Sequence, residues 1–227
     1  SNFERGFSFN SKGKLDMGMG LNAITAEYVL NHFDLKTLKD IFLVLGEERE
    51  GFRIAKNIVN QRKIKPIKYV PDLVNIIRKS KKKDFKKKIN ISTKTFQAIR
   101  IFVNKEISEL IEGLIKATKL LKSGGKIIVI SFHSIEDKIV KYFFTNFSKN
   151  KSKPSRYLPE NEILDKNLFD KYKNNVFRPS KKELEKNYRS RSAKLRFAVR
   201  STNKFEYPKD LIKKFEKYIN LEAINVK

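Results

Sequence analysis

The chain of 227 residues contains no cysteine, no tryptophan and only two histidines, His32 and His133. Without cysteine it can form neither a disulfide framework nor a thiolate metal site, and two histidines are too few for a histidine-rich one. No apolar run approaches the roughly 18 residues that a membrane-spanning helix needs. We therefore expect a soluble, cytoplasmic protein with no metal site and no membrane partner.

Acidic residues are also scarce. The chain has 25 Asp and Glu against 51 Lys and Arg, a formal charge of +26, and 40% of its residues are hydrophobic. That apolar content suffices for a packed core and excludes a disordered polyelectrolyte. A charge of this size attracts polyanions, of which nucleic acids are the commonest. A compositional drift toward lysine would give the same charge, so composition alone leaves nucleic-acid binding open.

Glycine is sparse, and four of the nine glycines lie in residues 1–20 together with several phenylalanines. Glycine permits tight turns and aromatic side chains anchor them, so we expect a structured loop. In that loop Phe7 and Phe9 are either anchors in a core or contacts to a ligand.

The middle of the chain shows helical periodicity. Apolar residues at three- and four-residue spacing predict helices over 23–33 and 35–45, a third that begins at residue 47, and a fourth over 72–79. Asp34 would cap the second helix. The basic stretch from Lys79 to Lys88 is expected to be an exposed loop that either neutralises phosphates or is merely solvated. Ser92 or Thr93 would then cap one long helix over 94–122.

A glycine pair at 124–125 separates that helix from an apolar run over 126–132, which predicts a central strand covered on both faces. Ser134 would cap the next helix. In open α/β sheets ligands collect at the carboxyl ends of strands, which makes Ser131, His133 and Ser134 candidates for a pocket wall. The alternative is structural, with Ser134 only a cap and His133 a satisfied loop histidine.

The last third of the chain alternates strictly over residues 194–200. Leu195, Phe197 and Val199 would lie on one face, and the basic residues between them would form an exposed outer face. A short strand over 174–178, a helix beginning after Ser180 and an amphipathic helix over 207–227 complete the pattern. Strands and helices together indicate an α/β protein.

Seven blocks of sequence, spread from Glu4 to Arg196 in one order, resemble the MraW (RsmH) family of bacterial methyltransferases. These enzymes use S-adenosylmethionine to methylate N4 of a cytosine in the decoding region of small-subunit (16S) ribosomal RNA. The blocks are Glu4 to Phe9, Leu15 to Met17, Gly46 to Arg49, Arg53 to Ala55, Thr95 to Arg100 with Val103-Asn104, Ile130 to Ser134 with Glu136-Asp137, and Arg191 to Arg196.

The resemblance implies a partial Rossmann-like methyltransferase fold with an inserted helical substrate-recognition domain. Residues 1–20 and 94–227 would form the C-terminal part of the methyltransferase domain, and 21–93 the insertion. The implied partner is small-subunit ribosomal RNA, held by three sets of residues and by a positive track over Arg62–Lys68 and Lys79–Lys88. Phe7 and Phe9 would shape the target-base side, Ser131, His133 and Ser134 would form a wall, and Arg191, Lys194 and Arg196 would contact phosphates.

The sequence departs from the family at several points. Residues 16–20 read Asp-Met-Gly-Met-Gly in place of Asp-Met-Arg-Met-Asp. No glycine-rich turn of the kind that holds S-adenosylmethionine after a first strand is present. We therefore expect that this chain lacks the N-terminal part that binds the cofactor and carries the catalytic residues. Two alternatives remain: a non-catalytic, basic RNA-binding module or remnant, and an unstable fragment whose sheet exposes unpaired edges.

Overall fold

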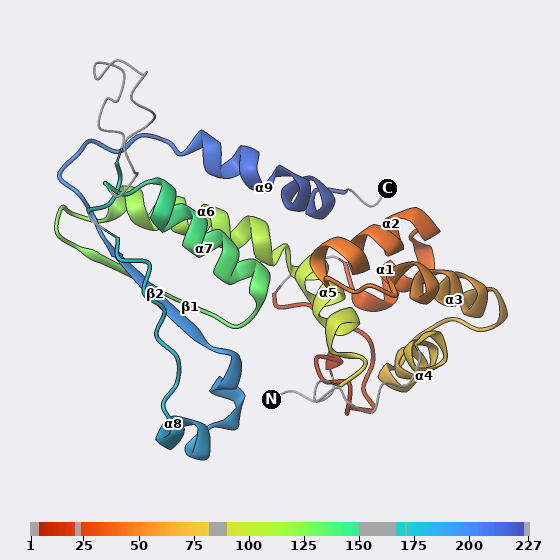
Figure 1. Cartoon of the computed structure of the whole chain (residues 1–227). Helices are drawn as coiled ribbons and strands as arrows, with labels where there is room; N and C mark the ends of the chain where they lie inside the picture. The colour runs from red at the N-terminus through yellow and green to blue at the C-terminus, as the bar shows by residue number, and fades with distance from the viewer. Residues whose placement is uncertain (1–4, 21–23, 82–89, 150–166, 171, 225–227) are drawn as a thin grey trace. The chain divides into compact units, whose positions relative to one another are not determined.

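The computed structural model describes residues 5–20, 24–81, 90–149, 167–170 and 172–224 (Figure 1). The chain divides into two compact units, Ser1–Ser108 with Lys217–Lys227 and Glu109–Glu216. Helices and strands are both present, as an α/β protein requires. None of the described helices is long and apolar enough to cross a membrane.

The first unit is helical. Side-chain caps start its first two helices: Thr25 accepts the Tyr28 N–H, and Asp34 accepts the Thr37 N–H at 2.6 Å. The capping role predicted for Asp34 is thus confirmed. Its helical elements are α1 (Ala26–His32), α2 (Leu35–Asp40), the π-helical turn η2 (Ile41–Leu45), α3 (Gly51–Ile64), α4 (Val70–Ser80) and α5 (Thr93–Asn104).

The loop over residues 5–20 packs against these helices, which confirms that it is structured. Leu15 and Met17 are fully buried. The Leu15 N–H donates to the Lys68 carbonyl, and the Glu27 N–H donates to the Leu15 carbonyl. Asn104 at the end of α5 fixes the far end of the loop, because its side chain donates to the Met17 carbonyl at 2.8 Å.

The long helix predicted over 94–122 is interrupted. Lys105 adopts a left-handed conformation with φ of 50° between α5 and α6 (Glu106–Leu120). The apolar spacing continues through the break, which is why the sequence pattern indicates one helix. A single left-handed residue redirects the chain without changing that spacing.

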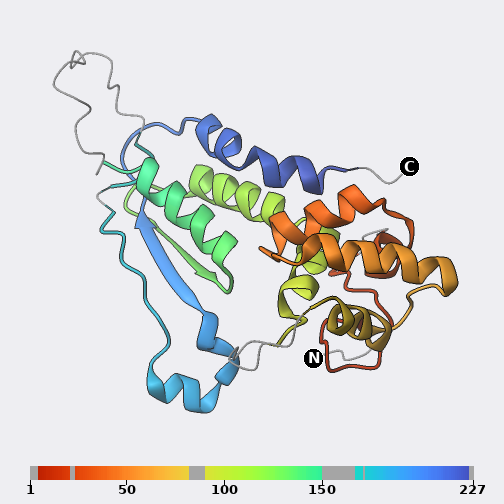
Figure 2. The same cartoon turned by 45° about the vertical axis from the view of Figure 1, so that its right-hand side comes forward.

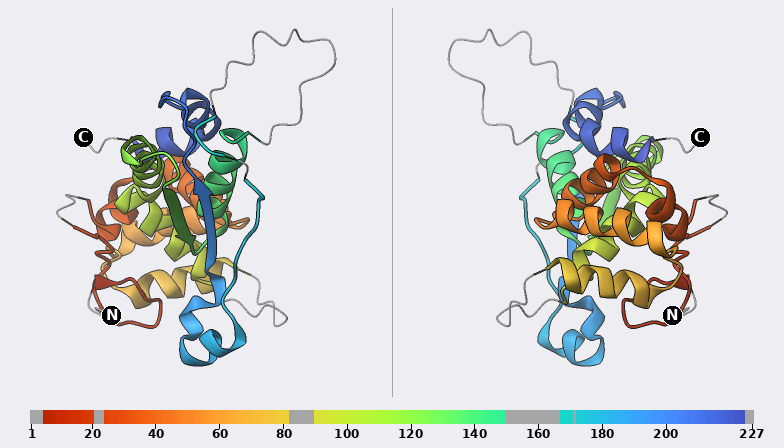
Figure 3. Two further views of the ribbon diagram at one scale, coloured as in Figure 1. Left: turned by 90° about the vertical axis from the view of Figure 1, so that its left-hand side faces the viewer. Right: turned by 90° about the vertical axis from the view of Figure 1, so that its right-hand side faces the viewer.

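The second unit contains the sheet. Strand β1 (Lys126–Ser131) pairs antiparallel with β2 (Lys194–Val199), in a register that sets Val129 opposite Arg196 (Figures 1 and 3). Helix α7 (Ser134–Asn146) packs against both strands. The remaining elements are the short helix α8 (Lys181–Lys186), the 3-10 helix η4 (Tyr188–Ser192) and α9 (Lys209–Glu222), whose last turns belong to the first unit.

Strand β1 is covered on one face only within the described residues, so the prediction of a strand covered on both faces is wrong here. Ile127 and Ser131 are buried, whereas Ile128 and Ile130 are 61% and 55% exposed. The apolar run therefore has a core face and an exposed apolar face.

Strand β2 has the predicted alternation with the two faces exchanged. Arg196, Ala198 and Arg200 are buried, while Phe197 is 37% exposed. The expected basic outer face is wrong because α7 lies over the Arg196 side. Its Asp137 neutralises the guanidinium there.

The two compact units leave the domain division expected from the resemblance untested. Residues 5–20 and 94–108 belong to the same unit as the helices between them. The assignment of 1–20 and 94–227 to a methyltransferase domain, with 21–93 as an insertion, stays a prediction about the family's architecture.

Candidate nucleic-acid interface

The turn between β1 and α7 is built by His133 and Glu136. The Glu136 N–H donates to His133 Nδ1 at 3.4 Å, and the N–H groups of Phe132 and His133 donate to Glu136 Oε2 at 2.8 and 3.2 Å. This reciprocal capping box satisfies N–H groups at the start of α7. The cap predicted at Ser134 is wrong by one residue, because Ser134 is already the first residue of the helix and is exposed.

The same contacts set the charge of this turn. Burial by itself would raise the pKa of Glu136, but hydrogen bonds from His133 and from backbone N–H groups outweigh it and hold the pKa below its ordinary value. His133 Nε2 also lies 3.3 Å from Glu136 Oε1. His133 thus makes the structural contacts that the alternative interpretation expected.

Ser131, His133 and Ser134 do not share one environment. Ser131 is 3% exposed and its hydroxyl donates to the Lys194 carbonyl at 3.3 Å. His133 belongs to the helix cap and Ser134 is exposed. Their combined role as the wall of a substrate site stays a prediction.

A buried charge cluster joins α7 to β2. Asp137 accepts from Arg196 Nε at 2.7 Å and from Lys194 Nζ at 2.9 Å. Arg196 Nη1 also donates to the Tyr172 hydroxyl at 3.0 Å and to Asn174 Oδ1 at 3.1 Å. We call these five residues the Asp137 cluster. Burial raises the pKa of Asp137, but the two cations outweigh it and hold that pKa below its ordinary value.

The Asp137 cluster bears on two residues predicted to contact phosphates. Arg196 is 6% exposed and its donors are engaged inside the chain, so this arrangement leaves it no access to a backbone phosphate. The half-buried Lys194 is paired with Asp137. Both residues are engaged by Asp137 because they lie on the covered face of β2, where a buried guanidinium needs a carboxylate partner close by.

Arg191 lies in different surroundings. It belongs to an exposed basic arm, residues 173–193, that contains α8 and η4 and continues past the end of the strands (Figure 2). The arm has seven basic residues against two acidic ones. The Arg191 guanidinium lies over the Tyr188 ring, 4.8 Å from its centroid, and Tyr188 is 71% exposed.

Two aromatic side chains, Phe177 of the basic arm and Phe197 of β2, meet on the exposed face of the sheet. Phe177 pairs with Leu195 through an isolated bridge, and its ring stacks on Phe197 with centroids 6.0 Å apart. Phe177 is 49% exposed. Exposed rings beside cations are the combination on which unpaired bases stack. In the sequence this signal lies in the Tyr188-Arg189-Ser190-Arg191 segment, of which the family resemblance covers only Arg191.

In the first unit, Phe7 and Phe9 are half-buried loop anchors. The Phe9 ring meets Phe96 edge-on at 6.2 Å, and the Arg5 guanidinium lies 6.0 Å from the Phe7 ring centroid. Arg5 is fixed in turn by Asp16 at 3.1 Å. These contacts fit the core-anchor interpretation, and contact with a target base stays a prediction.

The positive track predicted over 62–68 and 79–88 is only partly available. Arg62 donates to the carbonyls of Leu30 and Phe33 at 2.9 and 2.6 Å, and Lys81 pairs with the buried Glu48. The exposed cations of this region are Lys63, Lys65, Lys68, Arg78 and Lys79. Residues 82–89 lie outside the described part of the chain.

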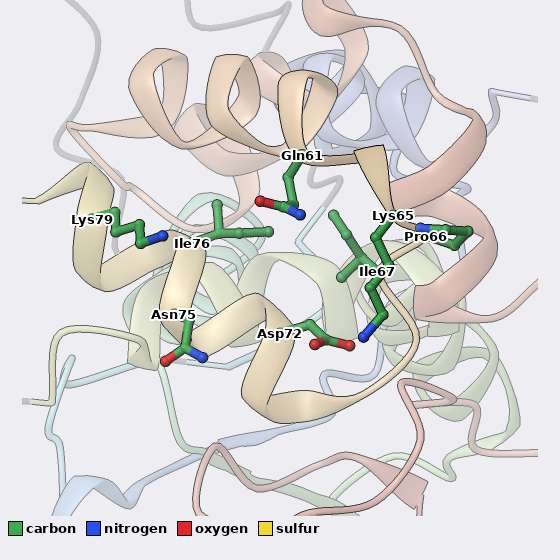
Figure 4. A pocket seen from close by; sticks show the side chains of 8 residues that line it. All are labelled: Gln61, Lys65, Pro66, Ile67, Asp72, Asn75, Ile76 and Lys79. Carbon is green, nitrogen blue, oxygen red and sulfur yellow. The ribbon is translucent and has the colours of Figure 1, made fainter. Parts of the chain in front are cut away.

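A pocket of about 170 Å³ lies between the end of α3 and the helix α4 (Figure 4). Buried Ile67 and Ile76 lie on its inner side, and the exposed Lys65 and Lys79 belong to its lining. Gln61 reaches from α3 toward α4 between the two isoleucines. The full lining is Gln61, Lys65, Pro66, Ile67, Asp72, Asn75, Ile76 and Lys79, and we call it the α3–α4 pocket.

The comparisons with known proteins agree with one another. The family model described as the MraW methylase family matches residues 1–201. The ribosomal RNA small subunit methyltransferase H of Bartonella bacilliformis is 45% identical over 198 residues, which are 87% of this chain and 59% of that protein. The proteins of the same name from Bartonella henselae and Agrobacterium fabrum are 44% and 42% identical, over 57% and 58% of their own lengths. The chain thus spans less than two thirds of these curated relatives.

Proposed function

Because the chain belongs to the MraW methylase family, we propose that it supplies the RNA-binding part of a ribosomal RNA methyltransferase. The proposed reaction is transfer of a methyl group from S-adenosylmethionine to N4 of a cytosine in the decoding region of the 16S RNA. The names of the relatives support ribosomal RNA of the small subunit as the substrate class. The basic arm is the observation that carries the RNA-binding role.

The basic arm suits single-stranded or loop RNA. Its cations would neutralise phosphates. Tyr188 presents an exposed ring, and the Arg191 guanidinium lies over that ring. Aromatic rings and guanidinium planes are the surfaces on which unstacked RNA bases rest. Arg191 is the predicted phosphate contact that keeps this role. Lys194 and Arg196 are better explained as the support that holds the neighbouring strand.

S-adenosylmethionine does not fit the residues of this chain that the structure describes. A cofactor site of the Rossmann type needs a glycine-rich turn after a strand and before a helix. Gly124 and Gly125 lie between α6 and β1, so they precede a strand, and β1 continues into α7 through Phe132 and His133 without glycine. We therefore derive no methyl-transfer step from these residues. We propose that this chain alone does not hold the cofactor.

The RNA-binding role is tested by titrating a labelled fragment of the 16S decoding region into the chain at several salt concentrations. The logarithm of the association constant should fall with the logarithm of salt, by about 0.7 for each phosphate contacted on a single strand. Replacing Tyr188 with Ala should weaken binding by roughly 1–3 kcal/mol, as for other base–aromatic stacks. The control is Tyr207→Ala, which removes a comparably exposed tyrosine outside the arm. Equal affinities for both variants would contradict the proposal.

A second candidate is a non-catalytic RNA-binding module, and the missing glycine turn favours it for this chain alone. Calorimetric titration with S-adenosylmethionine shows whether this chain binds the cofactor by itself. Heat of binding to the chain alone would refute our placement of the cofactor site. No heat from the chain alone, with methyl transfer to RNA restored by a longer version that contains a glycine-rich turn, would support the proposed enzyme over the module.

A further inference from the structure

We propose that the α3–α4 pocket binds one base of single-stranded RNA, a single-ring base by size, with the flanking phosphates at Lys65 and Lys79. This inference rests on the proposed RNA-binding function and adds a second contact site in the first unit. The end of α3 and the helix α4 would then form a site that discriminates between bases, in addition to the basic arm.

The size of the pocket favours a six-membered ring. Its volume is about 170 Å³. In another protein a cavity of about 150 Å³ lined by apolar side chains is enough to bind benzene. Ile67 is fully buried and closes the inner side, so the apolar surface that a ring can meet is that of the exposed Pro66 and, to a small extent, of Ile76, which is 5% exposed. A two-ring purine would extend beyond this space into solvent.

The polar lining suits a base edge. Among the described residues no hydrogen bond is made by the side-chain amides of Gln61 or Asn75. Elsewhere in the same unit, side-chain amides hold the fold together: Asn31 bonds the Glu27 and Ile67 carbonyls, and Asn57 donates to the Ser80 hydroxyl. An amide offers a donor and an acceptor together, which matches the donor and acceptor pattern on the Watson–Crick edge of a base.

The charge of the pocket suits RNA and not a free cation. Asp72 is the acidic residue of the lining, and its Oδ2 already accepts the N–H groups of Lys68 and Tyr69 at 3.3 and 3.0 Å. It serves as the acidic partner that starts α4. Lys65 directly follows the end of α3 and Lys79 lies on α4; both are exposed, with no ion pair between either of them and another described residue. Phosphates on either side of a bound base would meet these two ammonium groups.

The test uses fluorescence anisotropy with labelled ten-nucleotide oligo(U) and oligo(A). We expect tighter binding of oligo(U), and we expect Gln61→Ala to weaken oligo(U) binding by about five-fold, the loss that follows from removing one net hydrogen bond. Asn60→Ala is the matched control, since Asn60 is an exposed amide on α3 outside the pocket. Lys79→Ala should reduce the salt slope by about 0.7.

A second measurement locates the base directly. An oligonucleotide containing 4-thiouridine should form a photo-crosslink to peptides within residues 61–79. Crosslinks that fall entirely elsewhere, or a Q61A variant that binds oligo(U) as the wild type does, would refute the pocket while leaving RNA binding by the basic arm intact. A chain that binds no oligonucleotide would instead refute the proposed function. Circular dichroism of Q61A guards against misfolding, which is not expected because alanine is a strong helix former.

Discussion

Replacing Asp137 with Asn should be among the most destabilising single changes in the second unit. Asp137 is 9% exposed and balances the buried Arg196 and the half-buried Lys194. Removal of one partner from a buried pair leaves the other charge without compensation and costs about 3–5 kcal/mol. Because Asn keeps one acceptor oxygen for the guanidinium, we expect a loss near the lower end, about 3 kcal/mol.

The assay is urea unfolding followed by circular dichroism. Glu112→Gln is the control, because Glu112 and Lys116 form an exposed pair on α6 that should contribute nothing measurable. The double variant Asp137→Leu with Arg196→Met should recover part of the loss, since apolar residues of similar volume can replace a buried pair. A D137N variant as stable as E112Q would refute the reasoning.

The same pair gives a pH dependence with a definite sign. The pKa of Asp137 is lower in the folded chain than its ordinary value of 3.8, so near that pH the folded chain binds fewer protons than the unfolded chain. The stabilisation is complete at neutral pH and is lost as the pH falls below 3.8 through the folded pKa. The difference in unfolding free energy between wild type and D137N should therefore shrink as the solution is acidified, and a difference that stays constant would contradict the assignment.

Three further predictions use the same unfolding assay. Gly113 and Gly124 both have open space around them, but Gly124 has a φ of +77°. Gly113→Ala should therefore stabilise the fold by about 1 kcal/mol, while Gly124→Ala should destabilise it by about 1–2 kcal/mol. Changes in unfolding free energy of the same sign for the two variants would contradict this. Lys105→Gly should stabilise by up to about 1 kcal/mol, because glycine adopts the left-handed conformation at that position without steric strain; a loss would show that the Lys105 side chain contributes contacts. Burial raises the pKa of Glu222 above its ordinary value of 4.5, so its contribution to the stability of the folded state should decrease as the pH rises through and above 4.5, and Glu222→Gln should remove that dependence on pH.

The helices of the first unit were predictable because their apolar residues recur at helical spacing, and the caps of α1 and α2 are common types. Asp34 is an example, since its side chain bonds the Thr37 N–H where the pattern required a cap. Lys105 was not predictable, because a left-handed residue between two helices leaves the spacing intact. His133 was missed as a cap for another reason. Histidine is an uncommon capping residue, and the neighbouring Ser134 offered a common one.

The orientation of β2 could not be settled from alternation. A period of two divides a strand into two faces, but it does not say which face is covered. Arg196 and Arg200 lie on the covered face because each finds partners at long sequence distance: Asp137 for Arg196, and the Leu168 carbonyl for Arg200. In the sequence Asp137 lies three residues after Ser134, where it fits the acidic position of a capping pattern, and that position gives no indication of its pairing with Arg196.

These internal pairs change what the charge of +26 means for RNA binding. Arg62, Arg196 and Arg200 donate to groups inside the chain, so they contribute to the long-range field but not to direct phosphate contacts. Direct contact falls to exposed cations, and those beside exposed rings or a pocket can also select a base. The basic arm and the α3–α4 pocket have that combination. A positively charged surface without exposed rings or a pocket would bind RNA of any sequence. Base preference should therefore depend on the basic arm and the α3–α4 pocket, and overall affinity on the total charge.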